Sequence, residues 1–331
     1  MFWQRETSRR QILAGGLTVG AGAAAYLLVG CSPENESKSS VTQPDQVVAE
    51  KAGDYLISWL RTWPSQGPKA WHRAALSSIW ALSLASREKE VVFADGTEVE
   101  RFLSQAPINQ PELSKVVEVA NQLTYIDLAR GRISDQRTRE GYLAEAMKGR
   151  ELDGRNAAML YSLALNRWLQ ASGYGSIELA EILQKRVLAN RQTSGWCTDQ
   201  DSPVLEDRLP NVDTNAMAVL AGAATISLLE LGRQGQGWRH FVDDPDPRVE
   251  ENLESTVAVG WARGLGKESL GFVLGLQTVD GSFKHSSSDP KGYPGPTAEA
   301  LAYFASRTHP IFGKLSGNQL SRKESWLLTT C

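Results

Sequence analysis

Apolar side chains recur at helical spacing along most of the chain from Val47 onward, and this pattern limits the fold more than any other sequence feature. The first run places Leu56, Trp59 and Leu60 on one helical face, and Pro64 ends it. Only residues 90–96 have the composition of a strand. The sequence therefore predicts an all-α domain of roughly ten to twelve helices. Further runs lie at residues 75–82, 113–128, 160–168, 179–187, 213–231, 257–276 and 297–306, with a weak one at 320–328.

The bulk composition is that of an ordinary globular protein. The chain has 331 residues, 41% of them hydrophobic and 22% charged, which is enough to build one large core. No change in composition after residue 47 marks a second domain, so residues 47–331 are expected to form one domain. The net charge of -3 and the lack of a basic stripe exclude a nucleic-acid partner.

The first 31 residues have the three-part layout of a signal peptide. A positive flank with Arg5, Arg9 and Arg10 precedes an apolar run rich in Gly and Ala, and Gly30 stands directly before Cys31. An uncleaved membrane helix is the alternative, because the run is about long enough to span a bilayer. Its glycines make that helix weak, so we expect residues 1–30 to be removed.

Two short motifs in this segment resemble known export signals. Residues 8–13, which contain Arg9 and Arg10, resemble the twin-arginine export motif. Residues 28–31 resemble the bacterial lipobox, which implies that Cys31 carries a lipid. Residues 32–46 contain almost no apolar side chain, so residues 31–46 are expected to form a flexible linker. The resemblance implies an exported protein that is lipid-anchored to a bacterial membrane, on its periplasmic or cell-surface side.

The remaining cysteines, Cys197 and Cys331, are too few for a disulfide framework. Outside the cytoplasm they could form one bridge that ties the C-terminus to a central loop. The alternative is two unpaired thiols, and the sequence leaves both open.

Two segments of the chain, residues 192–220 and 277–301, follow the same plan. Each has a Gln at a helix end, a turn with Gly, an aromatic residue (Trp196 or Phe283), a polar loop, and a capping Asp213 or Thr297 before a helix of small residues. Gly permits the tight turn, the aromatic side chain fills the gap between helices, and the cap satisfies backbone N–H groups. Residues 153–160 form a third, degenerate unit. Repeated helical hairpins cannot bury their faces alone, so we expect them to stack or to close into a ring.

This repeat resembles the α/α-toroid repeat of terpene cyclases and protein prenyltransferases over residues 188–305. The resemblance implies that helical hairpins close into an α/α toroid, a barrel of paired helices whose inner ring lines a cavity. The catalytic motifs of both families are absent. Asp213 is the only carboxylate where the cyclases have an Asp-x-Asp-Asp-Thr acid motif, and Asn215 stands where the prenyltransferases have a zinc-binding Cys. Related toroids occur in polysaccharide lyases and glycosidases, so the fold alone does not define a function.

In such a toroid the loops that enter the inner helices meet at one mouth, and here these are residues 197–212 and 284–295. They contain carboxylates, a histidine and a tyrosine, which are the groups that acid–base chemistry on a sugar chain requires. The alternatives are solvated polar loops, an exposed His285, and Asp213 as a helix N-cap. The candidate catalytic residues are Asp201, Asp207, Asp213, His285 and Tyr293.

Two other features have a structural and a functional interpretation. The acidic run at residues 243–246 lacks the Gly and the closing Glu of a calcium-binding loop, so we expect a turn. Trp59, Trp63, Trp71 and Trp80 could stack on sugars or apolar ligands, but core packing is favoured.

The missing catalytic motifs favour a membrane-tethered, non-catalytic binding or accessory protein, with a carbohydrate or an apolar small molecule as its ligand. The alternative is a polysaccharide lyase or a glycosidase that acts at the mouth of the toroid. No metal-binding or phosphate-binding motif occurs in the sequence. The sequence does not identify a cofactor.

Overall fold

The computed structural model describes residues 43–67, 69–107, 112–131, 136–171, 173, 175–242 and 250–307. This part of the chain is largely helical, which confirms the expectation from the apolar periodicity. The predicted signal peptide with Arg9 and Arg10, the lipidation site Cys31, the acidic run at 243–246, the weak helix at 320–328 and Cys331 lie outside the described residues. Among the helices described, none combines the length and the apolar character needed to span a bilayer.

The described residues form eleven α-helices and one small sheet. The sheet is antiparallel, with strand order β1-β2-β3. The helices are α2 (Gln43–Leu60), α3 (Arg73–Leu84), α4 (Val99–Ser104), α5 (Leu113–Ala129), α6 (Gln136–Gly149), α7 (Asn156–Ala171), α8 (Ile177–Ala189), α9 (Val212–Leu220), α10 (Leu253–Arg263), α11 (Lys267–Gly275) and α12 (Pro294–Ala305), and the strands are β1 (Arg233–Gln234), β2 (Gly237–Arg239) and β3 (Glu251–Asn252).

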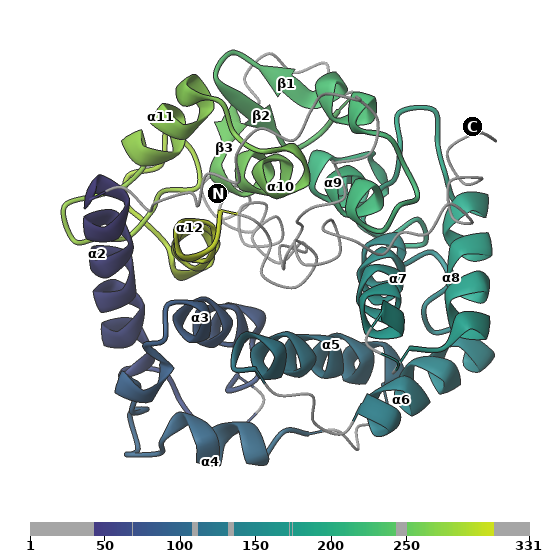
Figure 1. Ribbon diagram of the computed structural model, residues 1–331, viewed down its shortest axis with the longest axis horizontal. Coiled ribbons are helices and arrows are strands. Elements are labelled where there is room, and N and C mark those ends of the chain that lie inside the picture. Colours follow the sequence, from purple (N-terminus) through teal and green to yellow (C-terminus); the bar gives the residue numbers. More distant parts are fainter. Residues whose placement is uncertain are drawn as a thin grey trace.

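The helices lie in two sets around a common centre (Figure 1). The inner set consists of α3, α5, α7, α9, α10 and α12, and the outer set includes α2, α4, α6, α8 and α11. Each inner helix packs against the next in this order, and α12 packs against both α3 and α2. Segments from the two ends of the described chain are therefore neighbours in the fold.

Five aromatic side chains from the inner helices pack against one another in the core. Trp80 on α3 contacts Trp261 on α10 and Tyr125 on α5, with ring centroids 5.8 and 6.1 Å apart. Tyr125 stacks on Tyr161 of α7 at 4.5 Å, and Trp261 meets Tyr303 of α12 at 6.2 Å. All five are buried, and we call them the aromatic belt. The belt shows that inner helices on different sides of the centre touch through their side chains.

The other tryptophans of α2 and of the connection from α2 to α3 also pack against the core, as the sequence favoured. Trp59 and Trp63 lie with their rings 4.6 Å apart, and Trp71 stacks on Phe102 at 4.3 Å. These three are partly buried against the core cluster.

The repeat plan recurs in the hydrogen bonds at the ends of the helices. The indole N–H of Trp196 donates to the carbonyl of Val187 at 2.7 Å, and that of Trp238 donates to the carbonyl of Leu229 at 2.9 Å. Each indole thereby satisfies an acceptor at the end of a preceding helical turn. The structure thus contains a further unit, at Trp238, that lies between the two units identified in the sequence.

A second hydrogen bond joins each aromatic residue to the following inner helix. The backbone N–H of Trp196, Trp238 and Phe283 donates to a polar side chain one turn into α9, α10 and α12, respectively. The acceptors are Asn215 Oδ1 at 2.8 Å, Thr256 Oγ1 at 3.1 Å and Thr297 Oγ1 at 2.8 Å. Asn215, Thr256 and Thr297 are therefore equivalent positions of three units.

Several predicted boundaries were wrong, and glycines explain two of the errors. The run at 213–231 is α9 followed by a 3-10 helix, Ile226–Gly232, because the chain turns at Gly222 with φ of +71°. The run at 257–276 is split into α10 and α11 at Gly264, whose φ is +84°. Positive φ ends a helix and strongly favours Gly.

The predicted strand and the start of the domain also differ from the structure. Residues 90–96 contain only an isolated β-bridge, from Val92 to Glu98, whereas the sheet lies at residues 233–252. The fold is therefore not purely α-helical. Helix α2 begins at Gln43, before the expected domain boundary at Val47.

Candidate functional site

Helices α9 and α10 begin in the same way. Their N-cap residues are Asn211 and Asn252, whose side-chain oxygens accept hydrogen bonds from the backbone N–H of Thr214 (2.9 Å) and Ser255 (2.8 Å). Asp213 as the N-cap of α9 was thus a wrong prediction, since Asn211 has that role. Thr297 does not cap α12 either, because Tyr293 occupies the N-cap position.

A buried carboxylate follows each of these two caps and contacts a histidine. Asp213 Oδ2 lies 2.9 Å from Nδ1 of His240, and Glu254 Oε2 lies 3.5 Å from Nδ1 of His285. The carboxylates stand in the first turn of their helices, where the helix dipole stabilises a negative charge. We call these contacts the two histidine–carboxylate pairs.

The two pairs occupy equivalent positions of successive repeat units. His240 and His285 each stand two residues after the aromatic residue of their unit, Trp238 or Phe283. The backbone carbonyl of each histidine accepts a hydrogen bond from the residue before the paired carboxylate, and both distances are 2.8 Å. The repeat therefore places the same chemistry twice, side by side, at the ends of adjacent helices.

The surroundings of the pairs favour proton transfer or hydrogen bonding to a ligand. The side chains of Asp213 and Glu254 are almost fully buried, whereas those of His240 and His285 expose 15% and 31% of their surface. Because Nδ1 of each ring faces the carboxylate, Nε2 points away from it. A histidine oriented in this way can exchange a proton with a bound molecule through Nε2.

Nearby charges raise the pKa of His285. Burial alone would lower this pKa, but the hydrogen bond and charge of Glu254, together with the charges of Asp289 and Asp213, outweigh that effect. Asp213 belongs to the other pair, so the two pairs are electrostatically coupled. His285 therefore keeps its proton to a higher pH than a free histidine.

Further charges adjoin the pairs at the beginnings of the inner helices. Arg73, the first residue of α3, is half-buried, and the partial removal of its guanidinium from water lowers its pKa, while Glu299 of α12, Glu118 of α5 and Glu254 raise it. Glu299 and Asp289 are also buried. We define the rim cluster as Arg73, Asp213, His240, Glu254, His285, Asp289 and Glu299.

The unit at the start of α7 has the same backbone contact but no titratable side chain at the two positions equivalent to a histidine–carboxylate pair. The backbone N–H of Ala157 donates to the carbonyl of Thr198 at 3.2 Å, as the equivalent residues do in the two units with pairs. Ala158 and Thr198 stand where those units have a carboxylate and a histidine. The backbone arrangement therefore does not depend on the pairs.

The structure brings two of the five predicted site residues, Asp213 and His285, into the rim cluster. Asp201 is exposed next to Gly154, and no hydrogen bond or ion pair joins it to either histidine. Asp207 accepts a hydrogen bond from Ser202 at 2.7 Å within its own loop. Tyr293 is half-buried, and the ammonium group of Lys291 lies 5.6 Å from its ring centre.

Arg73, His240, Glu254 and Glu299 were not predicted, although the sequence contains a signal for one pair. His240 follows Trp238 at the same spacing as His285 follows Phe283, and Asn252 precedes Glu254 as Asn211 precedes Asp213. Recognition of the Trp238 unit as a repeat would have found both residues.

The described residues contain no group of three or more side chains suited to hold a metal ion. Cys197 is buried and makes no disulfide with the described part of the chain. Its Sγ lies 3.3 Å from Nε2 of Gln192 and 3.5 Å from Nδ2 of Asn156. Burial raises the pKa of this thiol, so it is poorly suited as a nucleophile.

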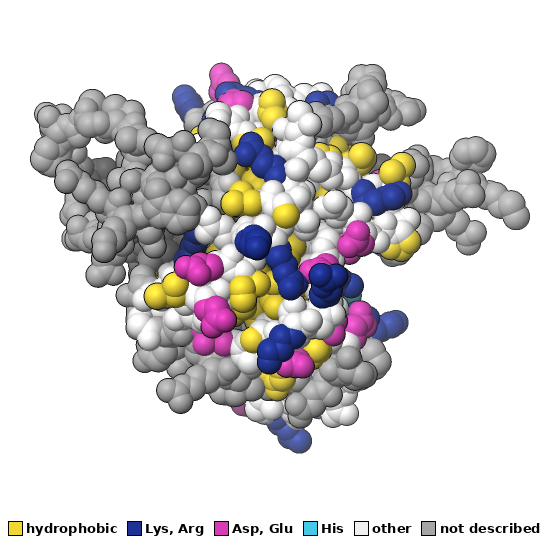
Figure 2. Space-filling view, turned by 90° about the vertical axis from the view of Figure 1, so that its right-hand side faces the viewer, with side chains coloured by type: hydrophobic (Ala, Val, Ile, Leu, Met, Phe, Trp, Pro, Cys, Tyr) yellow, Lys and Arg dark blue, Asp and Glu magenta, His cyan; other side chains and the backbone are white. Residues whose placement is uncertain are grey.

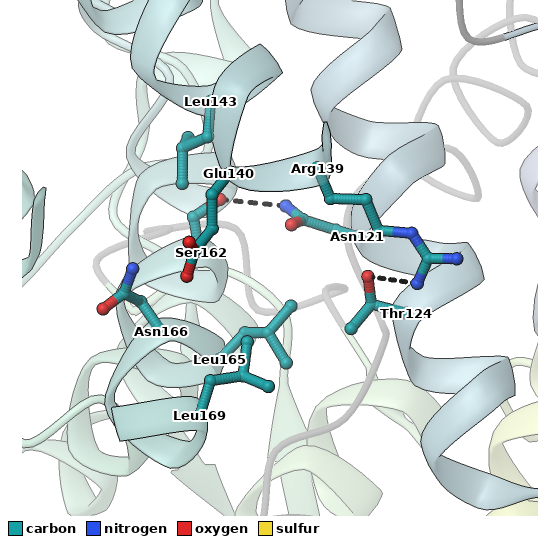
Figure 3. A pocket seen from close by; sticks show the side chains of 9 residues that line it. All are labelled: Asn121, Thr124, Arg139, Glu140, Leu143, Ser162, Leu165, Asn166 and Leu169. Atoms are coloured by element: carbon teal, nitrogen blue, oxygen red, sulfur yellow. Dashed lines mark hydrogen bonds between the residues drawn. The ribbon is translucent and has the colours of Figure 1, made fainter. Parts of the chain in front are cut away.

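A second polar site lies between α5, α6 and α7, where side chains of all three helices face a small pocket (Figure 3). Asn121 donates to Ser162 Oγ at 2.9 Å, and Arg139 donates to Thr124 Oγ1 at 2.7 Å. The pocket is about the size of a water molecule, so it cannot hold a substrate.

Figure 2 shows the side of the molecule with α8, where positive and negative side chains are interspersed with small apolar patches. Neither positive nor negative side chains dominate this face.

Comparison with known proteins does not assign the chain to a family. No protein-family model matches the sequence, and no curated protein matches it.

Proposed function

We propose that the protein is an exported lipoprotein, held at a bacterial membrane by a lipid on Cys31, whose helices close into an α/α toroid. The sequential packing of α3, α5, α7, α9, α10 and α12, with α12 on α3, supports this fold. We further propose that the toroid is a glycan-cleaving enzyme, a polysaccharide lyase or a glycosidase, with its active site at the rim cluster.

The two histidine–carboxylate pairs are the observation that carries the catalytic proposal. Burial of a carboxylate opposes folding unless the carboxylate is paired. The chain buries a carboxylate beside a histidine at equivalent positions of two units. The unit of Ala158 and Thr198 folds without such a pair, so the backbone does not require it. A histidine held at Nδ1 by a carboxylate is the usual arrangement of a general acid or base.

The aromatic belt argues that the substrate binds at the rim and not deep inside. Trp80 and Trp261 are buried and contact each other from α3 and α10. This packing leaves little support for an apolar small molecule enclosed among the inner helices. An extended sugar chain that lies across the helix ends fits better.

The two pairs have complementary roles in this proposal. His285, whose pKa is raised, donates a proton through Nε2 to the glycosidic oxygen of the leaving sugar. His240, held by Asp213, accepts a proton through Nε2. In a glycosidase that proton comes from the attacking water, and in a lyase it comes from the carbon next to a uronate carboxylate.

The test is turnover by the full chain, purified in detergent, on soluble neutral, amine-bearing and uronate glycans. New reducing ends report any cleavage, and ultraviolet absorbance of an unsaturated sugar reports a lyase. We expect His285→Asn and Asp213→Asn to lower the rate of cleavage by about 100-fold or more, while the exposed Asp201→Asn retains it. If no glycan is cleaved and glycan binding depends on the same residues, the protein is a non-catalytic binding protein and the catalytic proposal fails.

A further inference from the structure

The charge of the rim cluster indicates the class of ligand. We propose that this cluster recognises a glycan that carries protonated amines, in preference to a neutral or uronate glycan. The inference rests on the rim cluster as the site of the proposed function, but it does not depend on whether the glycan is cleaved.

The rim cluster has an excess of negative charge in every protonation state of its histidines. Its four carboxylates are those of Asp213, Glu254, Asp289 and Glu299, and all four are buried. The only permanent cation of the cluster is Arg73. With all four carboxylates ionised, these seven residues sum to a net charge of -1 when both histidines are protonated (-4 + 1 + 2) and of -3 when both are neutral (-4 + 1). A low-dielectric site with this balance attracts a cation.

Arg73 does not supply the positive charge that a uronate substrate needs. A lyase must neutralise the carboxylate of its substrate before it can remove the neighbouring proton. Arg73 is half-buried, and its charge is opposed by those of Glu299, Glu118 and Glu254. Lys291 is exposed and lies over the ring of Tyr293, so its charge belongs to the loop surface.

Asp213 gives an independent indication of a ligand. Asp213 is only 5% exposed, and neither oxygen of its carboxylate accepts a hydrogen bond from the described residues. Its Oδ2 lies 2.9 Å from Nδ1 of His240, and its charge also acts on His285, so the carboxylate adjoins both histidines of the cluster. A buried carboxylate oxygen without a donor is destabilising.

An ammonium group is the donor that this position lacks. It carries three N–H groups and a positive charge, and charge-assisted hydrogen bonds to carboxylate are stronger than neutral ones. The hydroxyls of Thr214 and Ser255, which follow the two paired carboxylates in sequence, also have no hydrogen-bond partner among the described residues. They add acceptors at the same helix ends.

The experiment measures binding of matched oligosaccharides to the full chain by calorimetry. The probes are a glucosamine oligomer, its fully N-acetylated counterpart and a uronate oligomer of equal length, with an oligolysine to separate a glycan site from a general polycation site. We expect the amine oligomer to bind roughly tenfold more tightly than the acetylated one, and this preference to weaken at high salt. Equal or tighter binding of the acetylated, uronate or oligolysine probe would overturn the inference.

Variants locate the effect at the cluster. Asp213→Asn should abolish the preference for the amine oligomer, and Asp201→Asn, which removes the same charge from an exposed loop, should leave it intact. If Asp213→Asn does not fold, as judged by circular dichroism, Glu254→Gln replaces it. A preference that survives both cluster variants contradicts the proposal. Cleavage of the uronate probe alone would uphold the proposed function and refute this inference. Tight binding of the amine probe without cleavage of any glycan would uphold this inference and refute the catalytic proposal.

Discussion

The units at the starts of α7 and α9 share a scaffold and differ in chemistry. In both, a backbone N–H at the start of an inner helix donates to the carbonyl two residues after a buried tryptophan, Trp196 or Trp238. The residue that accepts this hydrogen bond is Thr198 in one unit and His240 in the other. The residue after the donor is Ala158 in the first unit and Asp213 in the second. The comparison teaches that backbone and aromatic contacts hold the repeat together, while the side chains at the helix ends are left to vary.

The largest expected effect concerns the shared scaffold. Trp196→Ala and Trp238→Ala each remove a fully buried indole and its hydrogen bond, so each should lower the free energy of unfolding by about 3–5 kcal/mol. Urea unfolding followed by circular dichroism measures both. A much smaller loss in one variant would show that the two units are not held in the same way.

The second effect concerns the chemistry that only one unit has. His240→Asn or His285→Asn should lower the turnover of a cleaved glycan by about 100-fold or more, because general acid–base catalysis contributes that much. Steady-state kinetics gives the value, and the melting temperature is the control for folding. Full activity in both variants would exclude the pairs from catalysis.

The third effect is a pH dependence of stability that the α7 unit should not have. The folded-state pKa of His285 is raised, so its stabilising contribution is fully present below the unfolded value of about 6.5 and is lost as pH rises through the folded value. The urea midpoint of the wild-type protein should therefore exceed that of His285→Asn most clearly at acidic pH. Glu254→Gln should remove most of this difference, since Glu254 is the main cause of the raised pKa. A difference that grows towards alkaline pH would contradict this assignment.

The smallest effect tests whether a histidine alone recreates a pair. Thr198→His places an imidazole at the equivalent position of the α7 unit, where Ala158 offers no carboxylate. Thr198 Oγ1 accepts a hydrogen bond from the buried Asn211 at 2.9 Å, so its loss should cost about 1 kcal/mol of stability, whereas the pH dependence of the urea midpoint should remain that of the wild type. A new pH-dependent step would show that position 198 has an acidic neighbour of its own.

The helical part of the fold could be predicted because apolar spacing reflects burial on one face of a helix. The breaks at Gly222 and Gly264 were missed, since apolar side chains recur on both sides of each glycine. The sheet at residues 233–252 was missed because its strands are only two or three residues long. Such strands depend on the contacts around them and have no periodicity of their own.

The site could be predicted only where it coincides with a recognised repeat unit. Asp213 and His285 lie in the units at 192–220 and 277–301, whereas His240 and Glu254 lie in the unit that was not recognised. Asp201 and Asp207 were selected for their charge alone, and the structure places them in contacts with Gly154 and Ser202. Composition of a loop does not define the direction of its side chains.

The packing of α12 against α2 and α3 has a consequence for the order of events during biosynthesis. Residues near position 50 acquire these neighbours only after the ribosome has made residues near position 300, so the nascent chain cannot complete its native contacts in sections. Contacts of such long sequence separation slow folding and prolong the exposure of apolar faces. The twin-arginine route, which the resemblance at Arg9 and Arg10 predicts, carries folded proteins and would let this slow step finish in the cytoplasm before export.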